Sequence, residues 1–75
     1  MPAAPVLLYV VPGCPHCAHE RAALAARGAE VREIDVRARP DAIPELMKLT
    51  GGRRIVPVIV DAAGIHVAPA GGSSF

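Results

Sequence analysis

Apolar residues in this chain concentrate in two short runs that no charged residue interrupts, at positions 6–11 and 55–60. Continuous apolar runs of this length, bounded by proline or glycine, are typical of strands buried on both faces. Residues 29–36 also have a strand-like pattern, but the charges within this segment indicate an edge strand. A turn at 61–64 and a short strand at 65–67 complete the predicted sheet.

Two segments between these strands have the composition and spacing of helices. Residues 15–27 are mostly good helix formers, with Pro15 suited to the first turn and Gly28 to a left-handed stop. Residues 41–50 form the second predicted helix, which should be short because Pro44 is tolerated only in a first turn. Its apolar face follows the i, i+3, i+4, i+7 spacing through Ile43, Leu46, Met47 and Thr50.

The resulting order is β-α-β-α-β-β, which predicts an α/β domain whose helices cover a mixed four-stranded sheet. At 75 residues the chain has room for one domain, residues 1–75. We expect its core to span about 5–68 and residues 69–75 to form an irregular tail.

Charge and hydropathy exclude several function classes. The net charge of +1 offers no basic excess for a phosphate backbone, so we expect no nucleic-acid partner. The apolar run at 6–11 is far too short to span a membrane, and the first residues do not resemble a secretory signal. We therefore expect a cytoplasmic monomer.

The chemistry of the chain concentrates in Cys14-Pro15-His16-Cys17, which follows a predicted strand and begins a predicted helix. The N–H groups and partial positive charge of a helix N-terminus lower the pKa of a thiol at Cys14, and a protonated His16 adds to the effect. Cys17, one turn further on, is expected to stay protonated until it closes a disulfide with Cys14. A metal site that also uses His16 and His19 is an alternative, although these ligands crowd one helical turn.

At this point the chain resembles the glutaredoxin family of the thioredoxin-like superfamily. The resemblance covers about residues 5–67 and rests on three matching segments: YVVPGCPHC at 9–17, EIDV at 33–36 and LTGGRRIVP at 49–57. It implies a minimal thioredoxin-like fold in which the family's terminal helix is missing. It also implies a dithiol thiol–disulfide oxidoreductase that acts on protein or small-molecule disulfides. No tightly bound cofactor is implied; glutathione or a thioredoxin-reductase-type donor would return the electrons.

The resemblance further implies that Pro57 is cis and lies against the cysteines, and that the Val56 backbone pairs with the substrate. A proline inside an apolar strand does require such an explanation, because it removes a ladder hydrogen bond. Gly71 and Gly72 are weakly similar to the family's glycine pair at the glutathione site. Arg54 could attract a carboxylate of the substrate.

Several departures from the family pattern concern glutathione. Val11 stands where many members carry lysine, Pro44 lies where a basic or amide residue is common, and Ser73-Ser74 replaces an acidic pair. We therefore expect weak glutathione binding. Two other functions remain open: a metal or iron–sulfur module that uses Cys14 from two subunits, and a non-catalytic interaction domain.

Overall fold

The computed structural model describes residues 5–75, so the first four residues of the predicted domain lie outside the described part. Its main sheet has four strands in the order β2-β1-β4-β5. These strands are β1 (Val6–Val10), β2 (Val31–Asp35), β4 (Val58–Asp61) and β5 (Gly64–Val67). Strand β1 pairs in parallel with β2 and antiparallel with β4, and β5 pairs antiparallel with β4. The predicted mixed sheet and the edge position of β2 are confirmed.

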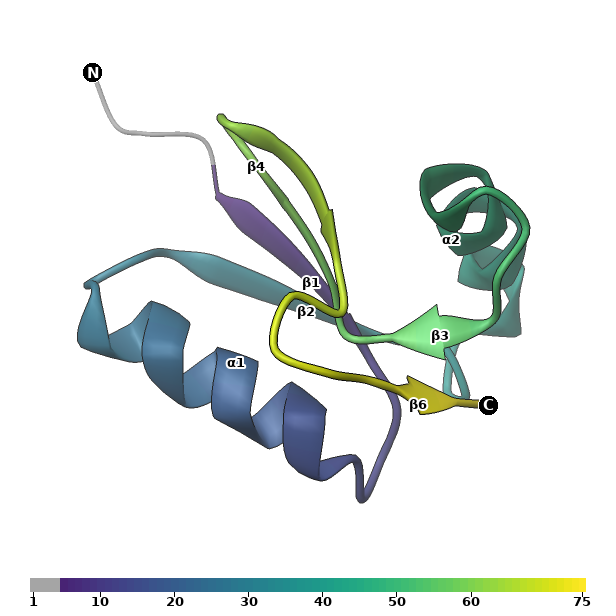
Figure 1. The fold of residues 1–75 in the computed structure, drawn as a ribbon, viewed down its shortest axis with the longest axis horizontal. Coiled ribbons are helices and arrows are strands. Elements are labelled where there is room, and N and C mark those ends of the chain that lie inside the picture. Colours follow the sequence, from purple (N-terminus) through teal and green to yellow (C-terminus); the bar gives the residue numbers. More distant parts are fainter. Residues whose placement is uncertain (1–4) are drawn as a thin grey trace.

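The two helices are α1 (Pro15–Ala26) and α2 (Ile43–Thr50), the second preceded by a 3₁₀ turn, η1 (Pro40–Ala42). Gly28 and Gly51 follow them with φ values of 70° and 72°, the left-handed conformation that glycine adopts without steric cost. Figure 1 shows α1 and α2 separated by the strands of the main sheet.

Strand β1 is the centre of the core. Its consecutive residues Leu8 and Tyr9 are both almost fully buried, although neighbouring side chains of a strand point to opposite faces of the sheet. Both faces of the sheet must therefore be covered. Leu24 of α1 and Leu46 of α2 are buried in the same apolar cluster.

The predicted strand at 55–60 is divided at Pro57. Residues before the proline form β3 (Ile55–Val56), and those after it continue as β4 in the main sheet. The Val56–Pro57 peptide bond is cis, as the resemblance implied. Val56 and Pro57 are both completely buried.

The prediction of an irregular tail was wrong. Ser73–Ser74 form a last strand, β6, which pairs antiparallel with β3 in a second, two-stranded sheet. In Figure 1 the chain turns back after β5 and runs beside β3 to the C-terminus. The tail is ordered because β3 offers it a free backbone edge, and because Phe75 packs partly buried against the core.

Candidate active site

Cys14 lies at the N-cap of α1, directly after the turn that ends β1. Its backbone is extended, with φ −82° and ψ 114°, and Pro15 occupies the first turn of the helix. The Cys14 Sγ accepts a hydrogen bond from the backbone N–H of Cys17 at 3.3 Å. The sulfur thus satisfies one of the N–H groups that a helix start leaves free, in the manner of a capping side chain.

A second contact with Cys14 comes from the far end of the chain. The Ser73 Oγ lies 3.6 Å from the Cys14 Sγ, and the thiol donates to it. Ser73 is paired with Val56 across β6 and β3, so this contact links β3 to the thiol through Ser73. The C-terminal strand also helps to bury Cys14, whose exposed fraction is only 7%.

The two thiols differ strongly in their tendency to ionise. Burial alone would raise the pKa of Cys14. Once Cys14 is ionised, its thiolate accepts hydrogen bonds from the Cys17 thiol, the Ser73 hydroxyl and the backbone N–H groups of Cys17 and His16, and these bonds outweigh burial and leave the pKa below its ordinary value. Burial, followed by the hydrogen bond to Cys14, raises the pKa of Cys17 to about 12. The first cysteine is therefore suited to attack, and the second retains its proton.

The predicted glycine pair is brought to the site although it lies far along the chain. A Cβ on Gly71 would lie 3.0 Å from the His16 ring, and one on Gly72 would lie 2.7 Å from the Val56 carbonyl oxygen. These close approaches require residues without side chains. The glycines thus let the C-terminal segment pack against the helix start and against β3.

From the sequence, we expected the His16 ring to help lower the pKa of Cys14, but the structure places this ring elsewhere. The ring faces Gly71, and the group of His16 that lowers the pKa of Cys14 is its backbone N–H.

Arg54 lies at the other end of β3, where its guanidinium stacks on the Phe75 ring at 4.9 Å from the ring centroid. His19 is mostly exposed, with its Nε2 at 3.9 Å from a Glu20 carboxylate oxygen.

The predicted alternative of a metal site concerns clusters of histidine, cysteine and acidic side chains. Within residues 5–75, no three histidine, cysteine or acidic side chains lie close enough together to hold an ion.

In the same described part of the chain, no helix has the length and apolar character needed to cross a bilayer.

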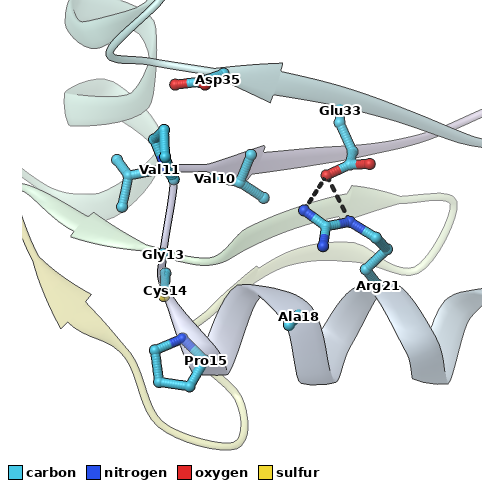
Figure 2. Close-up of a pocket in the computed structure, with 10 residues that line it drawn as sticks. Val10, Val11, Gly13, Cys14, Pro15, Ala18, Arg21, Glu33 and Asp35 are labelled. Atoms are coloured by element: carbon cyan, nitrogen blue, oxygen red, sulfur yellow. Dashed lines mark hydrogen bonds and ion pairs between the residues drawn. The ribbon is translucent and has the colours of Figure 1, made fainter.

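A groove of about 550 Å³ runs from Cys14 along α1 toward β2 (Figure 2). Val10, Val11 and Ala18 supply apolar lining, and Asp35 lies at its β2 side. Figure 2 shows Arg21 of α1 reaching Glu33 of β2, with its Nε at 2.8 Å and its Nη2 at 2.6 Å from one carboxylate oxygen.

The sequence did not reveal Ser73 as part of the site, nor this groove. A serine near the end of the chain has no local feature that ties it to a cysteine 59 positions earlier. The glycines before it were the available signal, since an unexplained Gly-Gly pair often marks a close backbone approach.

Comparison with known proteins agrees with this geometry. The family model described as Glutaredoxin matches residues 6–67. A glutaredoxin of Neisseria meningitidis serogroup B is 36% identical over 56 residues, which cover 73% of this chain and 66% of that protein. The chain thus spans slightly less than two thirds of the length of this relative. The matched region contains both cysteines, both helices and the whole main sheet, and the chain therefore belongs to the glutaredoxin family, a family of thiol–disulfide oxidoreductases.

Proposed function

We propose that this protein is a dithiol thiol–disulfide oxidoreductase in which Cys14 attacks and Cys17 resolves. The observation that carries the proposal is the contrast between two adjacent thiols: the pKa of Cys14 is lowered and that of Cys17 is raised to about 12. A reactive thiolate beside a protonated partner is the arrangement that two-step disulfide exchange needs.

In the first step the Cys14 thiolate attacks one sulfur of a target disulfide. A new S–S bond joins Cys14 to the target, and the other target sulfur leaves as a thiolate that takes a proton from water. In the second step Cys17 loses its proton and attacks the Cys14 sulfur. The second target sulfur then leaves as a thiolate, and the protein keeps a Cys14–Cys17 disulfide after giving two electrons to the target.

The two steps are coupled through the pKa of Cys17. After burial, the hydrogen bond and the charge of Cys14 are what raise this pKa. Once Cys14 is bound in a mixed disulfide, it carries no negative charge, so this contribution disappears. Cys17 consequently ionises more readily when it is needed.

The substrate-binding residues are proposed to be Val56, Pro57, Arg54 and the Gly71-Gly72 pair. Pro15 and His16, at the helix start, are proposed to be catalytic residues together with the two cysteines. Support comes from the position of Val56, which is linked to the thiol through Ser73. In this structure the Val56 backbone is paired with Ser73 of β6.

We further propose that reduced glutathione or a thioredoxin-reductase-type flavoprotein returns the electrons, and that the protein works as a cytoplasmic monomer on protein or small-molecule disulfides. Glutaredoxins in general use glutathione and hold no tight cofactor. Binding of glutathione is expected to be weak here, because Val11, Pro44 and Ser73 stand where charged or amide contacts are common in the family.

Stopped-flow reduction of a model disulfide by the reduced protein tests the proposal. The regenerating system is glutathione with its reductase in one series and thioredoxin reductase in the other. We expect Cys14→Ser to abolish reduction, and Cys17→Ser to accumulate the mixed disulfide, which mass spectrometry detects. Wild-type rates in Cys14→Ser would overturn the assignment. Colour and visible absorbance of the protein as purified would instead indicate an iron–sulfur module.

A further inference from the structure

We propose that Ser73 is a further catalytic residue, whose hydroxyl donates a hydrogen bond to the Cys14 thiolate and stabilises it before attack. The inference rests on the proposed function, because it concerns the same nucleophile. It starts from the 3.6 Å separation between the Ser73 Oγ and the Cys14 Sγ, which are 59 positions apart in the sequence.

The backbone around Ser73 holds the hydroxyl in place. Ser73 pairs with Val56 and Ser74 with Ile55, and the N–H of Phe75 donates to the Arg54 carbonyl at 3.2 Å. Before β6, the chain reverses in a turn in which the Gly71 N–H donates to the Ala68 carbonyl at 3.1 Å. The serine is therefore fixed on both sides by backbone hydrogen bonds.

The alternation of side chains along a strand selects Ser73 over its neighbour. Successive residues of β6 point to opposite faces, so when Ser73 faces Cys14, Ser74 faces away from it. Ser74 is exposed, whereas Ser73 is partly buried. The chain thus contains two adjacent serines of which one contacts the thiol, which supplies a matched control.

A hydroxyl suits this position because it can serve both protonation states of the sulfur. It accepts from the Cys14 thiol and, by rotation of its O–H, donates to the thiolate. The bond to the charged form is the stronger of the two, so the contact favours ionisation. Arg21 lines the same groove, but its guanidinium is engaged with Glu33.

The proton balance of the step is simple. The Cys14 thiol releases its proton to water, Ser73 keeps its own, and the thiolate then attacks the target disulfide. When the sulfur enters a disulfide, its charge is gone and the contact with Ser73 weakens. Ser73 therefore stabilises the reduced thiolate form relative to the disulfide.

The test is the pH dependence of Cys14 alkylation by iodoacetamide in the reduced full chain, with the modified residue located by mass spectrometry. Cys17 does not interfere, since its pKa is raised to about 12 and it is only 1% exposed. We compare the wild type with Ser73→Ala, Ser73→Thr and the matched control Ser74→Ala.

In Ser73→Ala we expect the midpoint of the profile to move to higher pH. Below both midpoints, the alkylation rate should fall about tenfold, which corresponds to roughly 1.4 kcal/mol of lost thiolate stabilisation. The plateau at high pH should not fall, because the fully formed thiolate remains reactive. Ser73→Thr, which keeps the hydroxyl, and Ser74→Ala should both retain the wild-type midpoint.

An unchanged midpoint in Ser73→Ala would overturn the proposal. An equal shift in Ser74→Ala would also overturn it, since the effect would then come from strand packing. The alkylation profile needs no turnover, so it separates this proposal from the proposed function. A wild type that fails to reduce any disulfide refutes the function, while a Ser73-dependent midpoint would still support the role of Ser73 toward the thiolate.

Discussion

Replacing Gly72 by alanine tests whether the C-terminal strand is an integral part of the fold. At a glycine with ordinary backbone angles and free space around it, alanine stabilises a protein by about 0.4–1 kcal/mol, because it restricts the unfolded chain. The backbone of Gly72 does not have a positive φ, so an alanine at this position is not strained by its backbone angles. The contacts of the new methyl group therefore decide the sign of the effect.

Those contacts are too close to be accommodated without movement. The added Cβ would lie 2.7 Å from the Val56 carbonyl oxygen, 2.7 Å from the Ala68 Cβ and 3.0 Å from the Ile55 Cγ1. Forcing an extra methyl into a packed site typically costs about 1–3 kcal/mol. After the entropic gain is subtracted, we expect a net destabilisation of about 1–2 kcal/mol.

Thermal unfolding of the reduced protein, followed by circular dichroism, measures this effect. For a domain of 60–100 residues, 1 kcal/mol shifts Tm by about 4–8 °C, so Gly72→Ala should lower Tm by roughly 5 °C or more. Ala68→Gly is the matched background, because it removes one of the two closest contacts. The cost of Gly72→Ala should be smaller there, with a coupling of about 0.5 kcal/mol or more.

A rise in Tm for Gly72→Ala would refute the reasoning. It would mean that the methyl group meets open space and that β6 does not lie against β3 as described. An equal loss in the wild-type and Ala68→Gly backgrounds would contradict the Ala68 contact specifically.

Two further predictions concern the thiol chemistry. Because the Cys14 pKa is lowered, the rate of reaction with a model disulfide should rise about tenfold per pH unit below that pKa and level off above it. The plateau should begin at lower pH than for an unfolded cysteine, and a rate that still rises at the pKa of an ordinary thiol would contradict this. His16→Tyr should leave the Cys14 pKa and the redox potential close to their wild-type values, because the His16 ring faces Gly71 and the group that acts on Cys14 is the backbone N–H. In wild type we expect a potential at or above the upper end of the range of about −200 to −230 mV typical of glutaredoxins. A titration against glutathione buffers measures both proteins, and a clearly more negative potential in His16→Tyr would show that the His16 ring does act on Cys14.

Local features of the molecule followed from the sequence. The helix over 15–26, its proline start and its glycine stop depend on neighbouring residues, and the structure has them within a residue or two of the prediction. The contact between the Cys14 sulfur and the Cys17 N–H belongs to the same class, because it joins residues three positions apart across one helical turn. Periodicity and capping describe such short-range geometry well.

Pro57 already indicated an interruption of the segment at 55–60, but the strand at Ser73–Ser74 and its pairing with β3 depended on the tertiary structure. A strand of two residues has no hydrophobic pattern of its own, and its hydrogen bonds exist only where a partner edge is free. That edge is β3, which stands apart from the main sheet after the chain turns at Pro57. The same pairing positions Ser73 against Cys14. Contacts between residues this far apart in the chain require the whole fold to bring them together, so they leave no signal in the local sequence around either residue.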